Sequence, residues 1–477
     1  MLFNSIEYAI FLPIVFLLYW FVFNKNLKLQ NLFIVLVSYV FYGWWDWRFL
    51  FLIAFTSACS FAAGLLIDRF RGTPKKAKAI SVINIVINLL ILAVFKYYNF
   101  FVTSFADAFL GGRTDGLLLK VILPVGISFY TFKALSYSID VYLKKAEPTK
   151  DVIQFFAFVS FFPQLLAGPI DRATTLLPQF AKPRSFEYDT GVDGMRQILW
   201  GLFKKVVIAD NCALYVDKVF SSYQTQSGST LLLAAIFFAF QIYGDFSGYS
   251  DIAIGSGKLF GIKMMQNFSF PYFSRDIAEF WRRWHISLTT WFRDYVYIPL
   301  GGSRCSKAKI VRNTCVIFLL SGLWHGANWT FIAWGAYHAL LFLPLILLGK
   351  NRRYRDTVAE GRILPSCKEL GQMLLTFILV LFGWILFRAD GIGQAWQYIQ
   401  GVFTASLFNR PDISGVTGFS LAICIMLVVE WFQRNKKHAL DLSGLRSGIP
   451  RYAAYLALLF LTFALGGHAE NFIYFQF

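Results

Sequence analysis

The sequence has little charge for its length. Of its 477 residues, 15% are charged and 57% are hydrophobic. Soluble domains carry roughly 25% charged residues, because a water-facing exterior needs them. The shortage of charge therefore excludes an ordinary soluble protein of this size. It predicts an all-α polytopic membrane protein, since helices satisfy their own backbone hydrogen bonds in lipid.

Several familiar catalytic and ligand-binding patterns are also missing. The chain has no GxGxxG, Walker A, GxSxG or HExxH motif. None of the six cysteines forms a CxxC pair, and several lie in apolar segments, which is typical of small core residues. We therefore expect no disulfide framework and no metal site.

The charge that is present is mostly positive, with a formal net charge of +18. The positive residues gather in short loops between apolar runs, as in cytoplasmic loops of membrane proteins, so nucleic acid is not an expected partner. Basic loops at 24–28, 68–79 and 144–150 are separated by pairs of apolar segments and can share the cytoplasmic side. This arrangement predicts an extracytoplasmic N terminus. Arg434, Lys436 and Lys437 follow the apolar segment 417–433, and one further span after them predicts an extracytoplasmic C terminus as well. The first apolar run lacks a preceding basic residue and a following cleavage site, so we expect a membrane span there and not a removed signal peptide.

Apolar segments near the 20 residues that a span needs recur along the chain. They lie at 6–23, 31–44, 49–67, 80–104, 117–143, 152–170, 229–244, 370–389, 417–433 and 451–467. No internal repeat divides the chain, so we expect one integral membrane domain over 1–477. Its core would cover about 120–345, with peripheral spans in 1–104 and 370–467.

The middle of the chain, 160–310, does not divide into clean spans. Prolines interrupt its first part, and the aromatic stretch 267–300 carries seven charged residues. Irregular polar backbone at membrane depth persists only where protein buries it or a cavity hydrates it. We therefore expect re-entrant or interfacial helices around an inner chamber.

A long apolar stretch, 314–347, is interrupted by SGLWHGANW and has basic residues before and after it. If both ends are cytoplasmic, the stretch is too short for two full spans and a turn. The pattern predicts a re-entrant hairpin with His325 near its apex. Ionisable groups inside a membrane often mark a functional path, although a structural histidine bonded to a carbonyl is the alternative.

The chain has only five histidines. His285 lies in a stretch of Trp and Arg residues, where it is either part of an interfacial anchor or functional. We expect His338 to be packed and hydrogen-bonded, His438 to be a solvated loop residue, and His468 to serve local structure.

Histidine suits acyl transfer, because a neutral imidazole can accept a proton from an attacking hydroxyl. The developing oxyanion needs hydrogen-bond donors. Asn328 and the indole N–H of Trp324, close to His325 in sequence, are candidate donors.

Two further polar groups fall in apolar surroundings. Lys133 and Asp140 are seven residues apart, on one face of a helix, and could pair. Acid–base work or metal ligation is possible for the other group, but we favour hydrogen bonding of a chamber wall. That group consists of Asp245, Ser247, Tyr249 and Asp251.

Five segments in order resemble the membrane-bound O-acyltransferase (MBOAT) superfamily, and in particular its bacterial alginate O-acetyltransferase group. They are PVGISFYTFKALSYSIDVY (124–142), QFFAFVSFFPQLLAGPI (154–170), YGDFSGYSDIAIG (243–255), FWRRWHISLTTWFRDYVYIPLGG (280–302) and SGLWHGANWTFIAWG (321–335).

The resemblance implies a ring of about 10–12 transmembrane helices around a central chamber, with a tunnel from a cytoplasmic donor site to an outer acceptor site. It places the expected catalytic histidine on His325 and a second histidine on His285. It also implies acetyl-CoA or another acyl thioester as co-substrate, with no permanently bound cofactor.

From this resemblance we expect a multi-pass enzyme of the bacterial inner membrane. It would move an acetyl group from a cytoplasmic thioester to an outer acceptor, for O-acetylation of an exopolysaccharide or cell-wall glycan. An extracytoplasmic SGNH-type acetyltransferase is the expected partner. The alternatives are D-alanyl transfer from a carrier protein to teichoic acid, and a non-catalytic transporter.

Overall fold

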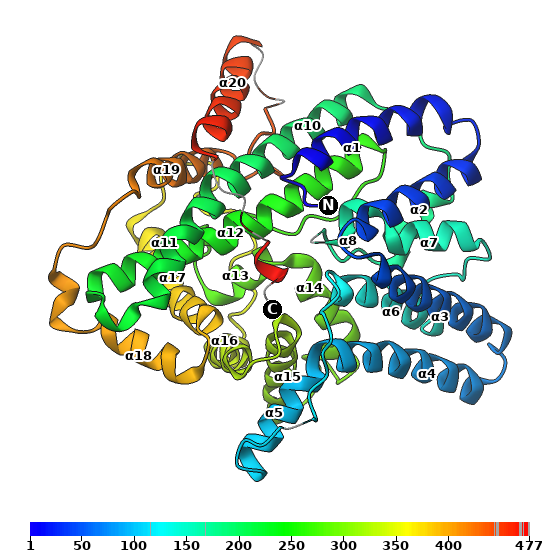
Figure 1. Cartoon of the computed structure of the whole chain (residues 1–477), viewed down its shortest axis with the longest axis horizontal. Coiled ribbons are helices and arrows are strands. Elements are labelled where there is room, and N and C mark those ends of the chain that lie inside the picture. Colours follow the sequence, from blue (N-terminus) through cyan, green and yellow to red (C-terminus); the bar gives the residue numbers. More distant parts are fainter. Residues whose placement is uncertain are drawn as a thin grey trace. The chain divides into compact units, whose positions relative to one another are not determined.

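The structure is a computed structural model of the chain (Figure 1). It describes residues 1–114, 116–166, 168–442, 444, 448–466, 470 and 472–475. His468 lies outside these residues. All regular elements within the described ranges are helices. The all-α prediction is therefore confirmed.

The chain forms two compact units, which are described separately. Unit 1 comprises Met1–Gly194 and Ala253–Met265, and unit 2 comprises Met195–Ile252 and Gln266–Phe477. Two helices, α10 (Tyr188–Leu202) and α12 (Gly228–Leu259), contain the boundaries between the units.

Among the residues that the structure describes, six helical stretches are long and apolar enough to cross a membrane. They are Trp47–Arg69, Pro74–Phe109, Gly228–Leu259, Trp329–Leu347, Cys367–Arg388 and Gly448–Leu465. Three shorter apolar helices are Ile6–Val22, Leu27–Gly43 and Thr417–Phe432. The prediction of a polytopic membrane protein is confirmed.

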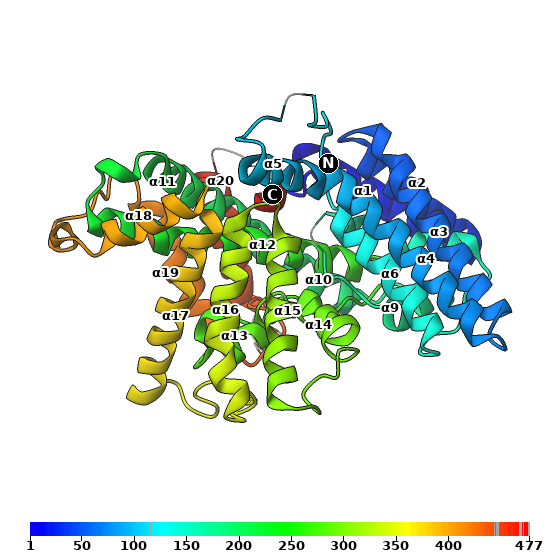
Figure 2. The same cartoon turned by 90° about the horizontal axis from the view of Figure 1, so that it is seen from below.

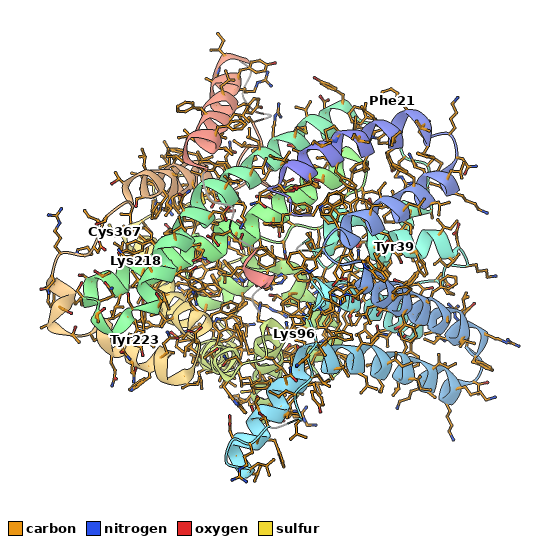
Figure 3. The ribbon with its side chains drawn as sticks, in the orientation of Figure 1. Phe21, Tyr39, Lys96, Lys218, Tyr223 and Cys367 are labelled. Carbon is orange, nitrogen blue, oxygen red and sulfur yellow. The ribbon has the colours of Figure 1, made fainter. Side chains whose placement is uncertain are left out.

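The exposed surface of these helices is apolar. On the first apolar helix, Ile6 is 78% exposed and Phe21 is 75% exposed, and Figure 3 shows Phe21 near the outer edge of the ribbon. On the last long helix, Phe463 is 82% exposed. Large apolar side chains exposed along whole helices fit a surface that contacts lipid rather than water.

In unit 1, α6 (Ile127–Tyr142) packs against α3 (Leu50–Arg69) and α4 (Pro74–Leu92). The other helices of this unit are α1 (Ile6–Leu17), η1 (Leu18–Val22), α2 (Leu27–Gly43), η2 (Trp47–Phe49), η3 (Ala93–Tyr97), α5 (Tyr98–Phe109), α7 (Val152–Ser160), α8 (Phe162–Leu165) and α9 (Ala173–Phe180). The predicted spans 117–143 and 152–170 are therefore shorter in the structure, because α6 begins at Ile127 and α7 ends at Ser160.

A buried polar chain links three segments of unit 1. The ammonium of Lys133 donates to Oε1 of Gln164 at 2.6 Å, and Nε2 of Gln164 donates to Asp171 at 2.5 Å. The second oxygen of Asp171 accepts from the backbone N–H of Met265 at 3.1 Å. Lys133 thus finds its partner outside its own helix, and the chain joins α6 to the segments around α8 and after α12.

In unit 2, α12 corrects one expectation. The sequence predicts a span at 229–244 followed by irregular structure, but α12 is one helix of 32 residues that continues through YGDFSGYSDIAIG. The helices before it are η4 (Phe203–Ala209), α11 (Asp210–Ser221) and η5 (Tyr223–Thr225). Ion pairs from η4, described below, neutralise the acidic residues that α12 carries.

The stretch 267–300 forms short helices, as expected. They are η6 (Pro271–Phe273), α13 (Ile277–Arg283), α14 (Ile286–Phe292) and η7 (Arg293–Tyr297). Asp276 caps α13 by accepting from the backbone N–H of Glu279. Between α13 and α14, His285 adopts a left-handed backbone conformation with φ 43° and ψ 54°. Such strain in a residue other than glycine persists only where its surroundings hold it.

The predicted hairpin is present, with longer legs than expected. Its legs are α15 (Lys307–His325) and α16 (Trp329–Leu347), and each contains 19 residues. At 1.5 Å per residue each leg is about 28 Å long. The turn at His325 is confirmed, but the expectation of short legs is wrong, because α15 already begins within the basic segment at Lys307.

Glycine brings the two legs of this hairpin into close contact. A Cβ at Gly322 would overlap the carbonyl oxygen of Phe331, and a Cβ at Gly335 would overlap that of Phe318. The backbones therefore touch at two levels, which fixes how far His325 lies from α16. The remaining helices of unit 2 are α17 (Cys367–Arg388), α18 (Ile392–Val402), η8 (Ala405–Phe408), α19 (Thr417–Phe432), α20 (Gly448–Leu465) and η9 (Ile473–Phe475) (Figure 2).

Candidate active site

The structure brings His285 and His325 together within unit 2. Their ring centroids are 6.3 Å apart, although forty residues separate them in sequence. His285 lies at the junction of α13 and α14, and His325 is the last residue of α15. Both are buried, with 1% and 3% of their surface exposed. Two imidazoles held this closely in a dry site can exchange protons with a substrate between them.

Aromatic side chains enclose the pair. The ring of Trp324 lies 5.0 Å from His325 and 5.7 Å from His285, so it contacts both. Three further rings surround His325, with centroids at 5.0 Å for Trp334, 5.3 Å for Phe387 and 5.5 Å for Tyr474. These large rings exclude water, which strengthens electrostatic interactions inside the site.

Asn267 fixes the hydrogen on the ring of His285. Its Oδ1 lies 3.0 Å from Nδ1 of His285, and it accepts from the backbone N–H of Ser287 at 3.3 Å and from Oγ of Ser287 at 3.0 Å. Because a backbone N–H can only donate, this atom of Asn267 must be the oxygen, and Nδ1 of His285 must carry the hydrogen. The neutral ring therefore keeps its lone pair on Nε2.

Burial also keeps His285 uncharged. Desolvation lowers the pKa of His285 to about 3. At neutral pH its ring is therefore a neutral imidazole, which has one nitrogen able to accept a proton or a hydrogen bond.

Asn328 has partners that give it a structural role. Its Oδ1 accepts from the backbone N–H of Thr330 and caps α16, while its Nδ2 donates to the carbonyl of Asp390 at 3.0 Å. Both polar ends of the side chain are thus engaged in the fold. Trp324, in contrast, lies against both histidines, so of the two candidate oxyanion donors it has the better position.

The four polar residues of α12 singled out in the sequence, Asp245, Ser247, Tyr249 and Asp251, lie around two ion pairs with η4. Lys205 of η4 pairs with Asp245 at 2.7 Å, and Lys204 pairs with Asp251 at 2.6 Å. Ser247 accepts from Lys204 at 2.8 Å. The ring of Tyr249 lies 5.6 Å from the ammonium of Lys205. These residues hold η4 against α12, and among the described residues no cluster of three or more His, Cys, Asp or Glu is arranged to hold a metal ion.

Two other histidines can now be placed. His338 is fully buried between Trp281 and Trp334, each 5.0 Å away, so packing is as expected. Its ring nitrogens have no hydrogen-bond partner within the described ranges, so the expected hydrogen bond is missing there. His438 is only 4% exposed, which corrects the expectation of a solvated loop residue. The basic loop folds back because Arg434 donates to the carbonyls of residues 358, 359 and 362.

Sequence reasoning missed the C-terminal contribution to the site. Tyr474 contacts His325 and also packs 4.6 Å from Phe246, which itself lies 4.6 Å from His285. The aromatic run NFIYFQF at the end of the chain was the available signal. Nothing in the sequence links that run to a histidine about 150 residues earlier.

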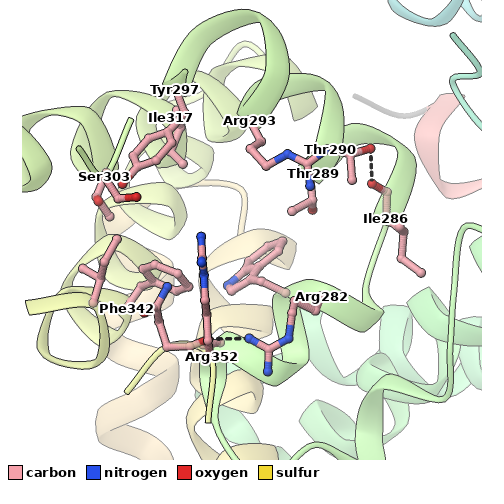
Figure 4. A pocket seen from close by; sticks show the side chains of 15 residues that line it. Arg282, Ile286, Thr289, Thr290, Arg293, Tyr297, Ser303, Ile317, Phe342 and Arg352 are labelled. Carbon is pink, nitrogen blue, oxygen red and sulfur yellow. Dashed lines mark hydrogen bonds between the residues drawn. The ribbon is translucent and has the colours of Figure 1, made fainter. Parts of the chain in front are cut away.

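Unit 2 contains a cavity of about 430 Å³. Neither His285 nor His325 lines it, but its lining includes Ile286, which follows His285 in the chain. It also includes Trp281, which packs 5.5 Å from Trp334, and Trp334 lies 5.0 Å from His325. Three arginines line it from separate segments, and Figure 4 shows their guanidinium groups along its wall: Arg282, Arg293 and Arg352. A lining that combines apolar side chains with guanidinium groups suits a molecule that has both an apolar part and an anionic part.

Known proteins share this sequence pattern over most of its length. The family model for MBOAT, the membrane-bound O-acyltransferase family, matches residues 41–383. A "probable alginate O-acetylase AlgI" of Pseudomonas aeruginosa is 39% identical over 431 residues, covering 89% of this chain and 80% of that protein. A peptidoglycan O-acetyltransferase of Helicobacter pylori is 34% identical, covering 82% of this chain and 77% of that protein.

A more distant relative has a different activity in its name. The teichoic acid D-alanyltransferase of Bacillus subtilis is 30% identical over 286 residues, covering 56% of this chain and 69% of that protein. The family match includes α12, α13 and α14 as well as both legs of the hairpin, and so the segments that carry His285 and His325. The chain therefore belongs to the membrane-bound O-acyltransferase family.

Proposed function

We propose that this protein is a membrane O-acetyltransferase that acts on an exopolysaccharide or cell-wall glycan, with His325 as its catalytic base. The single observation that carries the site assignment is the buried His285–His325 pair, with ring centroids 6.3 Å apart. The alginate and peptidoglycan O-acetylating relatives support the glycan as the final acceptor.

The chemistry follows from these side chains. His325 accepts the proton of the attacking hydroxyl, whose oxygen bonds to the carbonyl carbon of an acetyl thioester. The carbon–sulfur bond breaks, and the proton passes from the imidazolium to the departing thiolate. His285 donates from Nδ1 to Asn267, so Nε2 is the ring nitrogen that would accept a hydrogen bond from the hydroxyl or from a bridging water. The indole N–H of Trp324 is a candidate donor to the oxyanion.

The 430 Å³ cavity supports acetyl-CoA as the donor. CoA carries phosphate groups, which guanidinium groups bind by paired, charge-assisted hydrogen bonds. Arg352 can supply such a group. The guanidinium of Arg282 also donates to the carbonyls of Asn351 and Tyr354, and that of Arg293 pairs with Asp294 at 2.7 Å, so a phosphate would compete with these partners. Ile286 and Trp281 add apolar surface to the same cavity. The acetyl thioester would then enter with its reactive end toward the site.

We expect the mouth of this cavity to be cytoplasmic, because basic residues flank the α15–α16 hairpin that contributes to its lining, and we expect both termini to be extracytoplasmic. The acetyl group would pass to an extracytoplasmic SGNH-type partner enzyme or directly to a glycan hydroxyl. The protein would lie in the bacterial inner membrane, where a cytoplasmic donor and an outer glycan are both within reach.

The test offers radiolabelled acetyl-CoA to the full chain in nanodiscs together with its glycan acceptor and partner fraction. Wild-type protein should transfer label, and His325→Ala should lose transfer by about 10²-fold or more, as expected for a lost base, while still inserting. Transfer from an aminoacyl carrier but not from acetyl-CoA would show that the transferred group is D-alanyl and not acetyl. Unchanged movement of the labelled acetyl group across the membrane in His325→Ala would favour a transporter and refute the catalytic role of His325.

A further inference from the structure

The end of the chain is tied to the interior of unit 2 by hydrogen bonds to its backbone. These bonds come from η4, α11 and α12, so the segment is held at successive points before it reaches the histidines. They run from Asn211 to the carbonyl of Leu465 at 3.0 Å, from Lys205 to the carbonyl of Glu470 at 2.9 Å, and from the N–H of Ile473 to Asp245 at 2.6 Å.

The charges of this cluster explain why the segment binds there. Lys205 pairs with Asp210 and with Asp245, both at 2.7 Å, and all three side chains are at most 4% exposed. Two carboxylates thus share one ammonium. A buried carboxylate needs hydrogen-bond donors to replace water, and the backbone N–H of Ile473 supplies one to the second oxygen of Asp245.

The neighbours of Ile473 complete the attachment by ring packing. Phe472 lies 4.4 Å from the ring of Tyr249, and Tyr474 lies 4.6 Å from that of Phe246. Fixing the backbone at Ile473 therefore fixes both flanking rings. One of these, Tyr474, forms a wall of the site at 5.5 Å from His325.

We propose that Lys205 and Asp245 are positioning residues, which bind the backbone of Glu470 and Ile473 and so hold Phe472 to Tyr474 against the histidine pair, completing the site. The inference rests on the proposed function of that pair. Neither residue touches the reacting atoms; they act through the segment that they bind. A released segment would open one wall of the site and leave the thioester exposed to water.

The experiment compares Asp245→Asn with Glu430→Gln in the full chain in nanodiscs. Glu430 is a matched control, because it is also a buried carboxylate that contacts α12, through the hydroxyl of Tyr243 at 2.9 Å, and lies on α19. Two quantities are measured: the steady-state constants for acetyl transfer, and hydrogen–deuterium exchange of the C-terminal peptide that contains Ile473.

Asp245→Asn should lower kcat about tenfold, because it weakens the charge-assisted hydrogen bond from the N–H of Ile473. The KM for acetyl-CoA should change little, since this bond does not involve residues that line the donor cavity. The amide of Ile473 should exchange about tenfold faster, since its acceptor is no longer charged. Glu430→Gln should leave the exchange of this peptide as in the wild type.

An unchanged exchange rate in Asp245→Asn, or a loss of kcat no greater than in Glu430→Gln, would overturn the proposal. If Asp245→Asn does not fold and insert, the exchange rate of the Ile473 amide in the wild-type protein is the test. Exchange at the rate of an exposed loop would overturn the proposal, and strong protection would support it. A wild-type protein that transfers no acyl group would refute the proposed function, while the exchange measurements would still test the attachment.

Discussion

Replacement of Asn267 tests whether one buried amide sets both the orientation and the charge of His285. Asn267 is fully buried and is the acceptor for Nδ1 of His285 and for two donors of Ser287. Its own Nδ2 donates to Ser250 at 3.1 Å. Asn267→Ala removes the acceptor, whereas Asn267→Asp keeps an acceptor and adds a negative charge.

The magnitude follows from the donors that cannot find another partner. A hydroxyl can rotate, but the ring N–H of His285 and the backbone N–H of Ser287 cannot. Each buried donor left unsatisfied costs about 1–3 kcal/mol, so Asn267→Ala should destabilise unit 2 by roughly 2–6 kcal/mol. It should also free the ring of His285 to turn, and transfer should fall at least about tenfold.

Asn267→Asp should behave differently. An opposite charge in direct contact raises the pKa of an imidazole by roughly 1–3 units, which would move that of His285 from about 3 toward about 6. Transfer by the variant should then decline as the pH falls below about 6, where the wild-type ring stays neutral.

The assay is acetyl transfer in nanodiscs between pH 5 and 8, paired with thermal unfolding of each variant. A pH profile of Asn267→Asp that matches the wild type would refute the assignment of Nδ1 as the donor to residue 267. An unchanged unfolding temperature in Asn267→Ala would refute the claim that its partners are left unsatisfied.

Two further predictions concern the donor cavity and acid stability. Arg352→Ala should raise the KM for acetyl-CoA about tenfold with kcat unchanged, because one charge-assisted contact to the donor is lost. Arg353→Ala is the control and should leave the KM unchanged, since the guanidinium of Arg353 stacks on Tyr354. Equal effects of the two substitutions on KM would contradict the cavity assignment. The pKa of His285 is lower in the folded protein than in the unfolded chain, so the unfolded state binds more protons and stability should fall as the pH drops from about 6.5 toward 3. The free energy of unfolding of His285→Gln should depend less on pH over that range. An equal pH dependence in the variant and the wild type would contradict the burial argument.

Local patterns in the sequence were sufficient for the hairpin and for its apex. Basic residues at both ends and the polar, glycine-containing break around His325 predicted the turn, because charge and helix-breaking residues act within a few positions. The length of the legs was not predictable from hydropathy. The first turns of α15 carry Lys307, Lys309 and Arg312, and a helix can continue into such a segment where its side chains reach polar surroundings.

Long-range pairing explains the main errors. The apolar segment in the sequence ended at residue 244, and only the structure shows that Lys204 and Lys205 pair with Asp251 and Asp245 in the continuation of α12. The aromatic rings next to His325 likewise include one from the far end of the chain. Contacts of this kind depend on the tertiary fold and leave no periodic signal in the segments that make them.

The glycine contacts within the α15–α16 hairpin restrict how the site can vary. Since backbone meets backbone at Gly322 and Gly335, even a methyl group at either position would push the legs apart. The displacement would be transmitted to the end of α15, because a helix moves as a rod over so short a length. The separation of the two imidazoles is thus determined partly by residues that touch neither ring. A search for variants that accept a larger acyl group could begin at Gly322 and Gly335, where substitution would widen the gap between the legs and leave both histidines in the sequence.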